Sequence, residues 1–205
     1  MYNNYIKRLI DVLVSSGTLI ILSPILLLIS LLVLKNHGRP ILFSQKRPGK
    51  NEMIFSMYKF RSMTNEMNSE GDLLSDDERL TKFGRTLRQT SLDELPELIN
   101  IFKGDMSLVG PRPLLIKYLN YYSNEEKTRH NVRPGLTGLA QINGRNLSSW
   151  DERLANDVKY VENITFKNDI KIIFKTIKTV LFKENIAIGK SHVMKNLDEE
   201  RKNIN

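Results

Sequence analysis

An uncharged apolar run near the amino terminus constrains the fold of this chain more than any other feature. From Val12 to Leu34 the sequence reads VLVSSGTLIILSPILLLISLLVL. As a straight helix this run would reach roughly 34 Å, enough to cross the hydrocarbon core of a bilayer. A cleaved signal peptide does not fit, because the run is too long for a signal core and is followed by no A-x-A-like cleavage site. The run therefore predicts a membrane contact.

Ser23 and Pro24 interrupt the run at its middle. Proline removes one helical hydrogen bond and disfavours helical geometry in the residue before it, so a bend is expected, and Ser23 is placed to bond a carbonyl that the bend frees. Basic residues flank both ends of the run, so the preference of Lys and Arg for the cytoplasmic side selects no single orientation. These residues are Lys7, Arg8, Lys35 and Arg39. A hairpin that enters and leaves through one leaflet and a kinked spanning helix both satisfy these observations, and the residues alone leave both open.

The overall charge favours an anionic partner. The 205 residues carry 31 Lys and Arg against 23 Asp and Glu, a net charge of +8, which suits phospholipid headgroups, a phosphorylated substrate or nucleic acid. The sequence contains no nucleic-acid-binding motif, so nucleic acid is not expected as a partner. The absence of cysteine excludes disulfides, thiolate catalysis and cysteine metal sites, and three scattered histidines argue against a histidine metal cluster.

Residues after the apolar run predict a mostly helical α+β domain with a small β-hairpin. Two short strands, 41–45 and 54–61, flank a turn-rich segment, RPGKNE. Alternation on the second strand places Lys59 on one face with Met57, where it either points into a site or lies on the surface. Residues 64–77 are polar, acidic and aperiodic, which predicts a loop. Helices are expected at 78–89, 96–102, 113–122, 149–163 and 169–183.

The helix expected at 169–183 is basic and amphipathic. Its apolar stripe comprises Ile170, Ile173, Phe174, Ile177, Val180 and Leu181, and its off-stripe lysines are Lys171, Lys175 and Lys178. A core-facing helix and a helix lying in the membrane interface both fit this pattern. The expected domains are therefore a membrane hairpin at 1–36, a catalytic domain at 37–183 that includes this helix, and a polar tail at 184–205 that is expected to fray.

Two adjacent carboxylates, Asp93 and Glu94, lie in the segment TSLDELPELIN. Ser91 and Glu94 match a capping box, in which the acid would only satisfy a backbone amide. Pro96 would then fall at the fifth helical position, where its missing N–H removes a hydrogen bond, whereas proline suits the first position. Pro96 thus favours a helix that starts there, with both acids in the preceding turn and able to face a cleft.

Basic and glycine-rich segments supply candidate phosphate contacts. Arg88 belongs to a basic stripe with Lys82 and Arg85, and Arg112 is held between two prolines in KGDMSLVGPRP, which restricts where its guanidinium can point. The segment RPGLTGLAQINGR combines three glycines with Gln141 and Arg145, but it matches neither the P-loop nor the dinucleotide fingerprint. Together with the carboxylates and the membrane segment, these groups indicate phosphoryl chemistry at a membrane surface, with Mg²⁺ to offset repulsion between anions.

The sequence resembles the bacterial sugar transferases called monotopic phosphoglycosyl transferases. The resemblance rests on a charged start and an apolar run broken by Ser-Pro, followed in order by SLDEL, KGDMSLVGPRP and RPGLTGLAQINGR. The resemblance covers about Tyr5 to Lys183. The small size, and YKFRSM with the acidic loop after it, look most like the branch that transfers diacetylbacillosamine 1-phosphate at the start of bacterial protein N-glycosylation.

The resemblance implies transfer of sugar 1-phosphate from a UDP-sugar to undecaprenyl phosphate, with release of UMP, at the cytoplasmic face of the bacterial inner membrane. It implies that Asp93 is the nucleophile of a covalent phosphosugar intermediate and a metal ligand, that Glu94 assists proton transfer or metal placement, and that Mg²⁺ is required. It also implies a re-entrant hairpin at Ser23 and Pro24. The positions assigned to diphosphate and nucleotide contacts are Lys59, Arg88, Arg112, Gln141 and Arg145.

The expected substrate is UDP-N,N'-diacetylbacillosamine or a related N-acetylhexosamine, with UDP-N-acetylgalactosamine and UDP-galactose as alternatives. The product would enter glycoconjugate or glycoprotein biosynthesis, and contact with downstream glycosyltransferases is a further expectation. A different class of function, a non-enzymatic membrane-tethered adaptor whose basic face binds phospholipid or a partner protein, also fits the charge and the apolar run.

Overall fold

The computed structural model describes residues 2–144, 148–181 and 195–202. Its α-helices are α1 (Lys7–Ile21), α2 (Ser23–His37), α3 (Asp76–Arg79), α4 (Lys82–Gln89), α5 (Glu97–Lys103), α6 (Leu139–Asn143), α7 (Trp150–Glu162), α8 (Phe166–Leu181) and α9 (Leu197–Arg201). Its strands are β1 (Leu42–Pro48), β2 (Ile54–Phe60), β3 (Ser107–Val109) and β4 (Gly135–Thr137). Short helical turns are η1 (Tyr2–Ile6), η2 (Lys50–Glu52), η3 (Leu92–Glu94), η4 (Ile116–Tyr121) and η5 (Glu126–Asn131). The expected α+β class with a small hairpin is confirmed.

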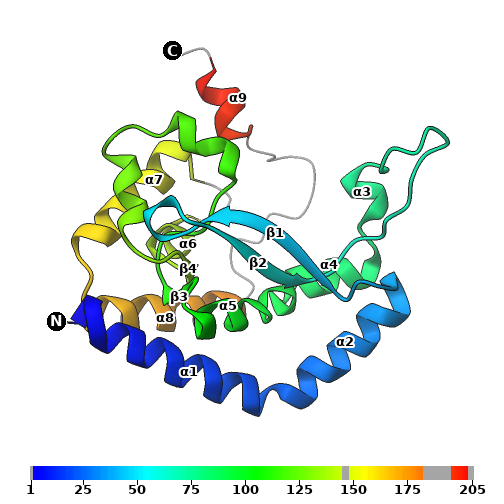
Figure 1. Cartoon of the computed structure of the whole chain (residues 1–205), viewed down its shortest axis with the longest axis horizontal. Coiled ribbons are helices and arrows are strands. Elements are labelled where there is room, and N and C mark those ends of the chain that lie inside the picture. The colour runs from blue at the N-terminus through cyan, green and yellow to red at the C-terminus, as the bar shows by residue number, and fades with distance from the viewer. Residues whose placement is uncertain (1, 145–147, 182–194, 203–205) are drawn as a thin grey trace.

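Helices α1 and α2 form a bent arm along the base of the molecule (Figure 1). The bend between them is 65° and lies at Leu22 to Pro24, as the Ser-Pro step predicts. Pro24 has no N–H to offer to the carbonyl of Ile20, four residues earlier, and the Ser23 Oγ donates a hydrogen bond to that carbonyl at 2.8 Å instead. The serine therefore satisfies the backbone oxygen that the proline leaves without a partner.

No single helix within the described ranges has both the length and the hydropathy needed to cross a membrane. In the part of the chain that the structure describes, α1 and α2 taken together across their bend reach the required length and hydropathy.

Helix α1 of the arm reverses the usual distribution of polar and apolar side chains, whereas α2 buries Ile29 and Val33 in an apolar cluster. The face of α1 toward the rest of the protein buries Lys7, Asp11 and Ser15. The Lys7 Nζ lies 2.6 Å from an Asp169 carboxylate oxygen, and Asp11 accepts a hydrogen bond from the Leu108 amide. The outward face exposes large apolar side chains on both helices: Leu9, Leu13, Val14, Ile20, Ile21, Ile25, Leu27, Leu28 and Leu31. Such a continuous apolar surface is typical of contact with lipid or another protein rather than with water.

Strands β1 and β2 form the expected antiparallel hairpin, with Lys59 paired opposite Phe43. Helix α5 packs beneath β2 through a buried apolar cluster of Met57, Leu98, Ile101 and Met106. Asn100 is fully buried between them, where its amide donates to the Ser56 carbonyl and accepts from the Tyr58 amide. These contacts fix the turn before α5 relative to β2, and hence relative to Lys59.

A two-residue parallel pairing between β3 and β4, Ser107 with Gly135 and Val109 with Thr137, joins the two glycine-containing segments. Neither strand was expected, because three residues are too few to show alternation. The backbones approach closely here, and a Cβ added to Gly138 would lie 2.1 Å from the Gly110 oxygen. Glycine is therefore needed where the two segments meet.

Two expected helices are interrupted or shortened. The expected helix at 78–89 is two helices, α3 and α4, because the backbone of Leu80 leaves the helix to form a bridge with Met63. The expected helix at 113–122 is only the 3₁₀ turn η4, since Leu115 is extended. The helices expected at 96–102 and 149–163 are confirmed as α5 and α7, within one residue at each end.

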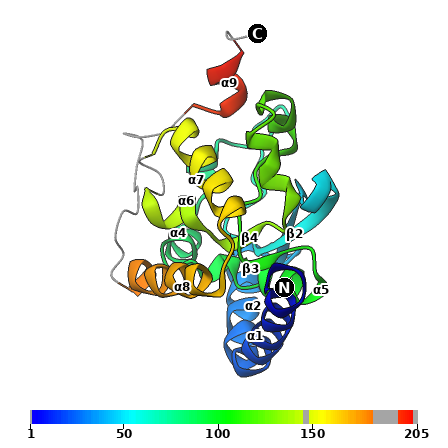
Figure 2. The same ribbon diagram turned by 90° about the vertical axis from the view of Figure 1, so that its left-hand side faces the viewer.

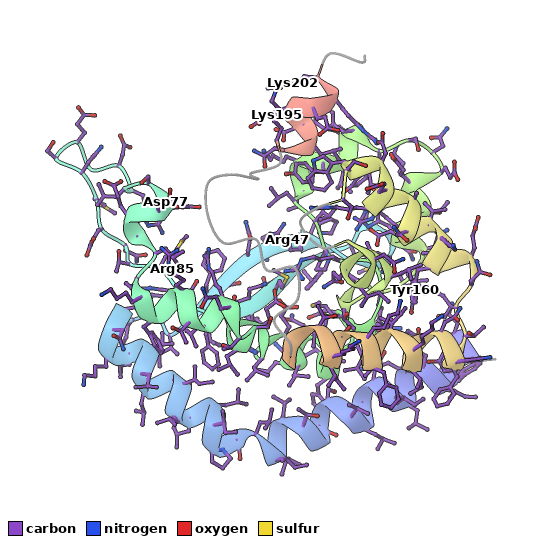
Figure 3. All side chains as sticks on the ribbon, turned by 180° about the vertical axis from the view of Figure 1, so that it is seen from behind. Arg47, Asp77, Arg85, Tyr160, Lys195 and Lys202 are labelled. Atoms are coloured by element: carbon purple, nitrogen blue, oxygen red, sulfur yellow. The ribbon has the colours of Figure 1, made fainter. Side chains whose placement is uncertain are left out.

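Helix α8 begins three residues earlier than expected, and its expected apolar stripe divides between two environments. Ile173 of the stripe packs partly buried against a cluster of Val109, Tyr160 and Ile172, whereas Phe174 and Ile177 point away from the core and are exposed. Ile172, which the expected stripe left out, is itself buried. Lys171, Lys175 and Lys178 are exposed as well. Tyr160 of α7 lies over α8 and donates its hydroxyl to Asp169, the residue that also binds Lys7 (Figure 3).

The expectation that the tail frays is wrong for its described part, whereas residues 184–194 lie outside the described residues. Helix α9 packs at the end of the molecule opposite α1 and α2 (Figure 2). Leu197 is fully buried against Tyr118 and Trp150, and Arg201 bonds Glu126 at 2.7 Å. A single leucine in a polar segment was too weak a pattern to predict this docking.

Candidate active site

Asp93 and Glu94 lie in the short turn η3, directly before α5. Ser91 adopts a left-handed backbone conformation (φ 55°) and makes no capping hydrogen bond, so the capping-box interpretation does not hold. Pro96 occupies the N-cap position of α5, where its missing N–H removes no helical hydrogen bond. The helix was expected to start at Pro96 and starts one residue later, at Glu97. The two carboxylates are therefore free of capping roles.

Glu94 binds two of the predicted basic residues. One of its carboxylate oxygens, Oε1, accepts from the Lys59 Nζ at 2.6 Å and from the Arg112 Nη2 at 2.7 Å. Burial alone would raise the pKa of Glu94, but the charges of Arg112 and Lys59 outweigh it and lower that pKa well below its usual range. Glu94 is therefore ionised and holds both cations beside Asp93.

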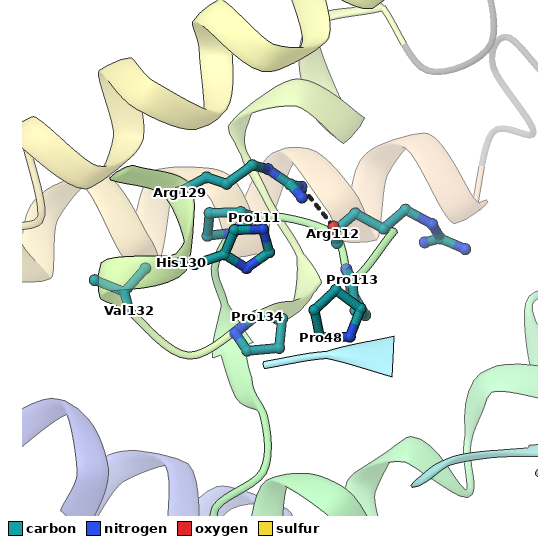
Figure 4. A pocket seen from close by; sticks show the side chains of 8 residues that line it. All are labelled: Pro48, Pro111, Arg112, Pro113, Arg129, His130, Val132 and Pro134. Carbon is teal, nitrogen blue, oxygen red and sulfur yellow. Dashed lines mark hydrogen bonds between the residues drawn. The ribbon is translucent and has the colours of Figure 1, made fainter. Parts of the chain in front are cut away.

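Arg112 is presented by a rigid loop (Figure 4). Its carbonyl accepts a hydrogen bond from the buried Arg129 at 2.7 Å, and its guanidinium points away from the prolines around its backbone. The surrounding side chains pack so closely that they leave no room for a ligand; they are Pro48, Pro111, Pro113, Pro134, Arg129, His130 and Val132. These packed side chains fix the backbone of Arg112, while its own side chain stays 43% exposed.

The Arg112 loop depends on a buried ion pair, which leads to a stability prediction. Arg129 pairs with Asp157 of α7 at 2.7 Å, and both side chains are buried. Asp157→Ala would leave the Arg129 charge buried without its partner, and it is expected to lower the free energy of unfolding by about 3–5 kcal/mol. Denaturant unfolding followed by circular dichroism measures this change. The exposed Asp72→Ala should change stability little, and an equal loss in both variants would contradict the assigned role.

Asp93 differs from Glu94 in that its carboxylate is buried without a bonded partner in the described ranges and its pKa is raised rather than lowered. Its residue is 8% exposed, and no hydrogen bond or ion pair reaches its carboxylate from the described part of the chain. Burial and the Glu94 charge raise the pKa of Asp93, while Lys59, Arg88 and Arg112 lower it, and the result is a pKa of about 6. Arg88 is held by a hydrogen bond from its Nε to the Ser62 hydroxyl at 2.9 Å. Asp93 is thus mostly ionised at neutral pH, yet its oxygens are available to a ligand.

A third carboxylate, Glu97, was missed by the sequence reasoning. It is buried, and its Oε1 lies 3.2 Å from the Lys59 Nζ, so that Lys59 lies between Glu94 and Glu97. Burial raises the pKa of Glu97, and the neighbouring Glu94 charge adds to that rise. No local pattern indicated Glu97, because Asp93 lies in η3 and Glu97 begins α5, so the two acids do not share one helix.

The structure does not bring every predicted contact residue to the carboxylates. Gln141, on α6, donates its amide to the Leu136 carbonyl at 3.0 Å, and its Oε1 is buried without a partner in the described ranges. Within the described ranges, the Gln141 side chain makes no hydrogen bond to Asp93, Glu94 or Arg112. Arg145 lies outside the described residues. Lys59, Arg88 and Arg112 are therefore the predicted basic residues that surround the acids.

The donor set around Asp93 fits a hard cation such as Mg²⁺ only in part. Among the described residues, no group of three His, Asp or Glu side chains is arranged to hold a metal. The Asp93 carboxylate has free oxygen donors, and Mg²⁺ in phosphoryl-transfer sites is commonly held by one or two carboxylates with substrate phosphates and water. The residues present are thus compatible with Mg²⁺ that arrives with a phosphorylated ligand.

Comparison with known proteins places this site in a family. The family described as Bacterial sugar transferase matches residues 2–183. EpsL of Bacillus subtilis, named an uncharacterized sugar transferase, is 49% identical over 181 residues, which cover 88% of this chain and 90% of EpsL. The undecaprenyl-phosphate galactose phosphotransferase of Salmonella typhimurium is 40% identical over 198 residues, which cover 87% of this chain and 41% of that protein. The UDP-glucose:undecaprenyl-phosphate glucose-1-phosphate transferase of Klebsiella pneumoniae is 41% identical over 185 residues, covering 85% and 40%.

The chain therefore spans most of EpsL but less than half the length of the Salmonella and Klebsiella proteins. The matched residues 2–183 include the bent arm, both carboxylates and the basic residues around them. From the family match and the identity to these relatives, we conclude that the chain belongs to the bacterial sugar transferase family and is a transferase.

Proposed function

We propose that this protein transfers a sugar 1-phosphate from a UDP-sugar to undecaprenyl phosphate through a covalent intermediate on Asp93. The observation that carries the proposal is the environment of Asp93, a buried carboxylate with no hydrogen-bond partner in the described part of the chain and with three cations close enough to lower its pKa. Two of the named relatives are sugar phosphotransferases of undecaprenyl phosphate, which supports the same class of reaction.

In the first step, an Asp93 carboxylate oxygen attacks the phosphorus that bears the sugar. The bond from this phosphorus to the bridging oxygen breaks, and UMP leaves with that oxygen. The product is an acyl phosphate that links Asp93 to the sugar, and no proton is gained or lost. Arg112 and Arg88 have exposed guanidinium groups, suited to the charge of the diphosphate as the bond breaks.

In the second step, a phosphate oxygen of undecaprenyl phosphate attacks the same phosphorus. The bond to Asp93 breaks, the carboxylate is restored, and undecaprenyl diphosphosugar is released. If the attacking phosphate carries a proton, Glu94 is the adjacent base, because it is ionised and lies next to Asp93 in the turn. Lys59, held between Glu94 and Glu97, keeps a positive charge at the reacting phosphorus.

We propose Mg²⁺ as the cofactor, with Asp93 as its protein ligand. When bound with the substrate, it would supply positive charge that reduces the repulsion between the diphosphate and the carboxylates. The carboxylate oxygens of Asp93 have no hydrogen-bond partner among the described residues and are available to it.

We further propose that the α1–α2 arm is a re-entrant hairpin in one leaflet and that the catalytic domain rests on the cytoplasmic face of the bacterial inner membrane. The proposal is supported by the apolar outward face of the arm, by the polar buried face of α1, and by the basic residues at both ends. Exposed Phe174 and Ile177 on α8, beside exposed lysines, suit an interfacial position for that helix. This placement would bring Asp93 to a lipid phosphate without extraction of the lipid.

The bend at Pro24 provides a test of topology. The chain has no cysteine, so single cysteines added at the amino terminus and at the exposed Asn36 can be labelled from either side of membrane vesicles with an impermeant maleimide. Both sites are expected to label from the same face. Pro24→Ala restores a helical hydrogen bond and is expected to shift part of the population to labelling from opposite faces, whereas Leu27→Ala should not. Opposite faces in the unaltered hairpin would contradict re-entry.

The pKa of Asp93 predicts a pH dependence for the first step. Protonation removes the nucleophile, so the rate of covalent labelling by a radiolabelled UDP-sugar is expected to fall about tenfold per pH unit below a midpoint near pH 6. Single-turnover labelling without undecaprenyl phosphate measures this step and avoids titration of the acceptor. A flat rate down to pH 4 would contradict the assignment of the nucleophile.

The sugar remains a proposal. We propose an N-acetylated hexosamine such as diacetylbacillosamine, on the resemblance of the YKFRSM segment and its acidic loop, although the relatives named above carry galactose and glucose in their names. A screen for UMP release across UDP-sugars tests this choice, and preference for UDP-galactose or UDP-glucose would contradict it. Repeated turnover of UMP release that requires Mg²⁺ and undecaprenyl phosphate, beyond the single UMP per protein of the first step, would also exclude a purely adaptor function.

A further inference from the structure

A polar groove, apart from the candidate active site, lies at the amino-terminal end of α1. It encloses about 410 Å³, within the range of about 300–1,000 Å³ typical of ligand sites. Basic side chains from three separate parts of the chain line it: Arg8 from α1, Lys50 from the tip of the hairpin, and Arg133 from the segment before β4. Tyr5 and Ser107 also contribute to its walls.

The groove carries positive charge that the described residues do not neutralise. Arg8, Lys50 and Arg133 form no ion pair with any described carboxylate, whereas the fourth cation, Lys7, is paired with Asp169. The one acid in the lining, Asp11, already accepts a hydrogen bond from the Leu108 amide. An anion in the groove would therefore meet three cations that lack an ion-pair partner among the described residues.

Two of the three cations of the groove, Arg8 and Arg133, are fixed by hydrogen bonds to the backbone, whereas Lys50 is exposed. Arg8 donates to the carbonyls of Ile101 and Phe102, and Arg133 donates to that of Gly104, so both guanidiniums are fixed at the carboxyl-terminal end of α5. The Ser107 side chain, in a residue 1% exposed, has a hydroxyl without a hydrogen-bond partner among the described residues. An unsatisfied buried hydroxyl beside fixed guanidiniums is suited to donate a hydrogen bond to a phosphate oxygen.

The surface beyond the groove indicates which anion it takes. Tyr5, in the groove wall, is 75% exposed, and the exposed Leu9 and Leu13 continue from it at helical spacing along the outward face of α1. A soluble phosphate would leave this apolar strip uncovered, whereas acyl chains would cover it. We propose that the groove binds the phosphate headgroup of an anionic phospholipid whose acyl chains lie along the outward face of α1.

This site is separate from the reacting carboxylates. The groove contacts the carboxyl-terminal end of α5, while Asp93 and Glu94 precede its amino-terminal end. Seven helical residues, about 10 Å of helix, lie between them. A lipid in the groove would thus hold α5 and the end of α1 at the membrane surface without occupying the place of the acceptor phosphate.

Native mass spectrometry of the full chain in a neutral detergent tests the proposal, because such a micelle offers no charged surface. The protein is expected to retain one phosphatidylglycerol in preference to phosphatidylcholine. Lys50→Gln is expected to weaken this retention about fivefold, the factor for one basic residue at an anionic headgroup. Ser107→Ala is expected to weaken it to a similar extent, about fivefold, through loss of one hydrogen bond. Lys46→Gln removes an equal charge from the same hairpin outside the groove and should change nothing.

The outcomes separate the possible occupants. Displacement of the lipid by glycerol 1-phosphate or inorganic phosphate at equal concentration would mean that the groove takes a free anion, and would overturn the lipid assignment. Equal weakening by Lys50→Gln and Lys46→Gln would also overturn it, since the effect would then be general charge. Because retention is read without turnover, an inactive Asp93 variant should bind the lipid as well as the unaltered protein does.

Discussion

Replacement of Asp93 by asparagine is expected to lower the rate of UMP release by a factor on the order of 10⁴ or more. The variant keeps the shape of the side chain but has no anionic oxygen to attack the phosphorus, and loss of a covalent nucleophile removes most of the catalytic effect. Steady-state UMP release with UDP-sugar, undecaprenyl phosphate and Mg²⁺ measures the change.

Loss of folding would not explain this effect. Burial of the ionised carboxylate raises the pKa of Asp93 above its usual value, which means that the charged form opposes folding at neutral pH. Asp93→Asn should therefore unfold at the same temperature as the unaltered protein or at a higher one. Asp72→Asn, on an exposed loop, serves as the matched control and should retain full activity. Turnover by Asp93→Asn at the unaltered rate would contradict the mechanism.

Replacement of Glu94 by glutamine is expected to lower the rate by about 10²–10³, within the range that an acid–base group contributes. Glu94 carries the negative charge that fixes Lys59 and Arg112, and without it Arg112 has no carboxylate partner among the described residues. The rate of covalent labelling and the rate of overall turnover, measured separately, show which step loses more.

The same variant should also shift the pH profile of labelling. The Glu94 charge raises the pKa of Asp93, so its removal lowers that pKa and moves the acid limb below pH 6. This direction follows from charge alone, and a merely unfolded or misassembled variant would not produce it. Glu125→Gln, a charge loss on an exposed turn, should leave both the rate and the profile unchanged. A shift of the acid side of the labelling profile to higher pH in Glu94→Gln would contradict the claim that the Glu94 charge raises the pKa of Asp93.

Local sequence patterns predicted much of the fold because they act through nearby residues. Pro24 alone predicts the bend, since a missing N–H has the same effect in any helix, and Ser23 was correctly expected to satisfy a freed carbonyl. Pro96 distinguished a helix start from a capping box, and the structure supports the former. Alternation was enough to find the hairpin of β1 and β2.

Features set by distant contacts were not predictable in this way. The β3–β4 pair joins segments that are about two dozen residues apart, and neither strand is long enough to show a pattern. Helix α3 is separated from α4 because Leu80 bridges Met63, which no propensity indicates. Leu197 docks only because Tyr118 and Trp150 come together to receive it.

The candidate site shows the same division. The sequence motifs predicted Asp93, Glu94, Lys59, Arg88 and Arg112, and the structure gathers these residues. The sequence motifs did not predict Glu97, because its role depends on the position of Lys59 on the neighbouring strand β2. The motifs also did not predict the groove near Tyr5, since Lys50, Ser107 and Arg133 meet there only after folding.

The most direct test of the central claim is to find the intermediate. The protein is incubated with UDP-sugar and Mg²⁺ but without undecaprenyl phosphate, quenched, digested and examined by mass spectrometry. The account predicts a sugar-phosphate adduct on the peptide that contains Asp93, at the Asp93 side chain, and its loss with formation of the lipid-linked sugar once undecaprenyl phosphate is added. An adduct on another residue, or UMP release only when both substrates are present with no adduct formed, would contradict it.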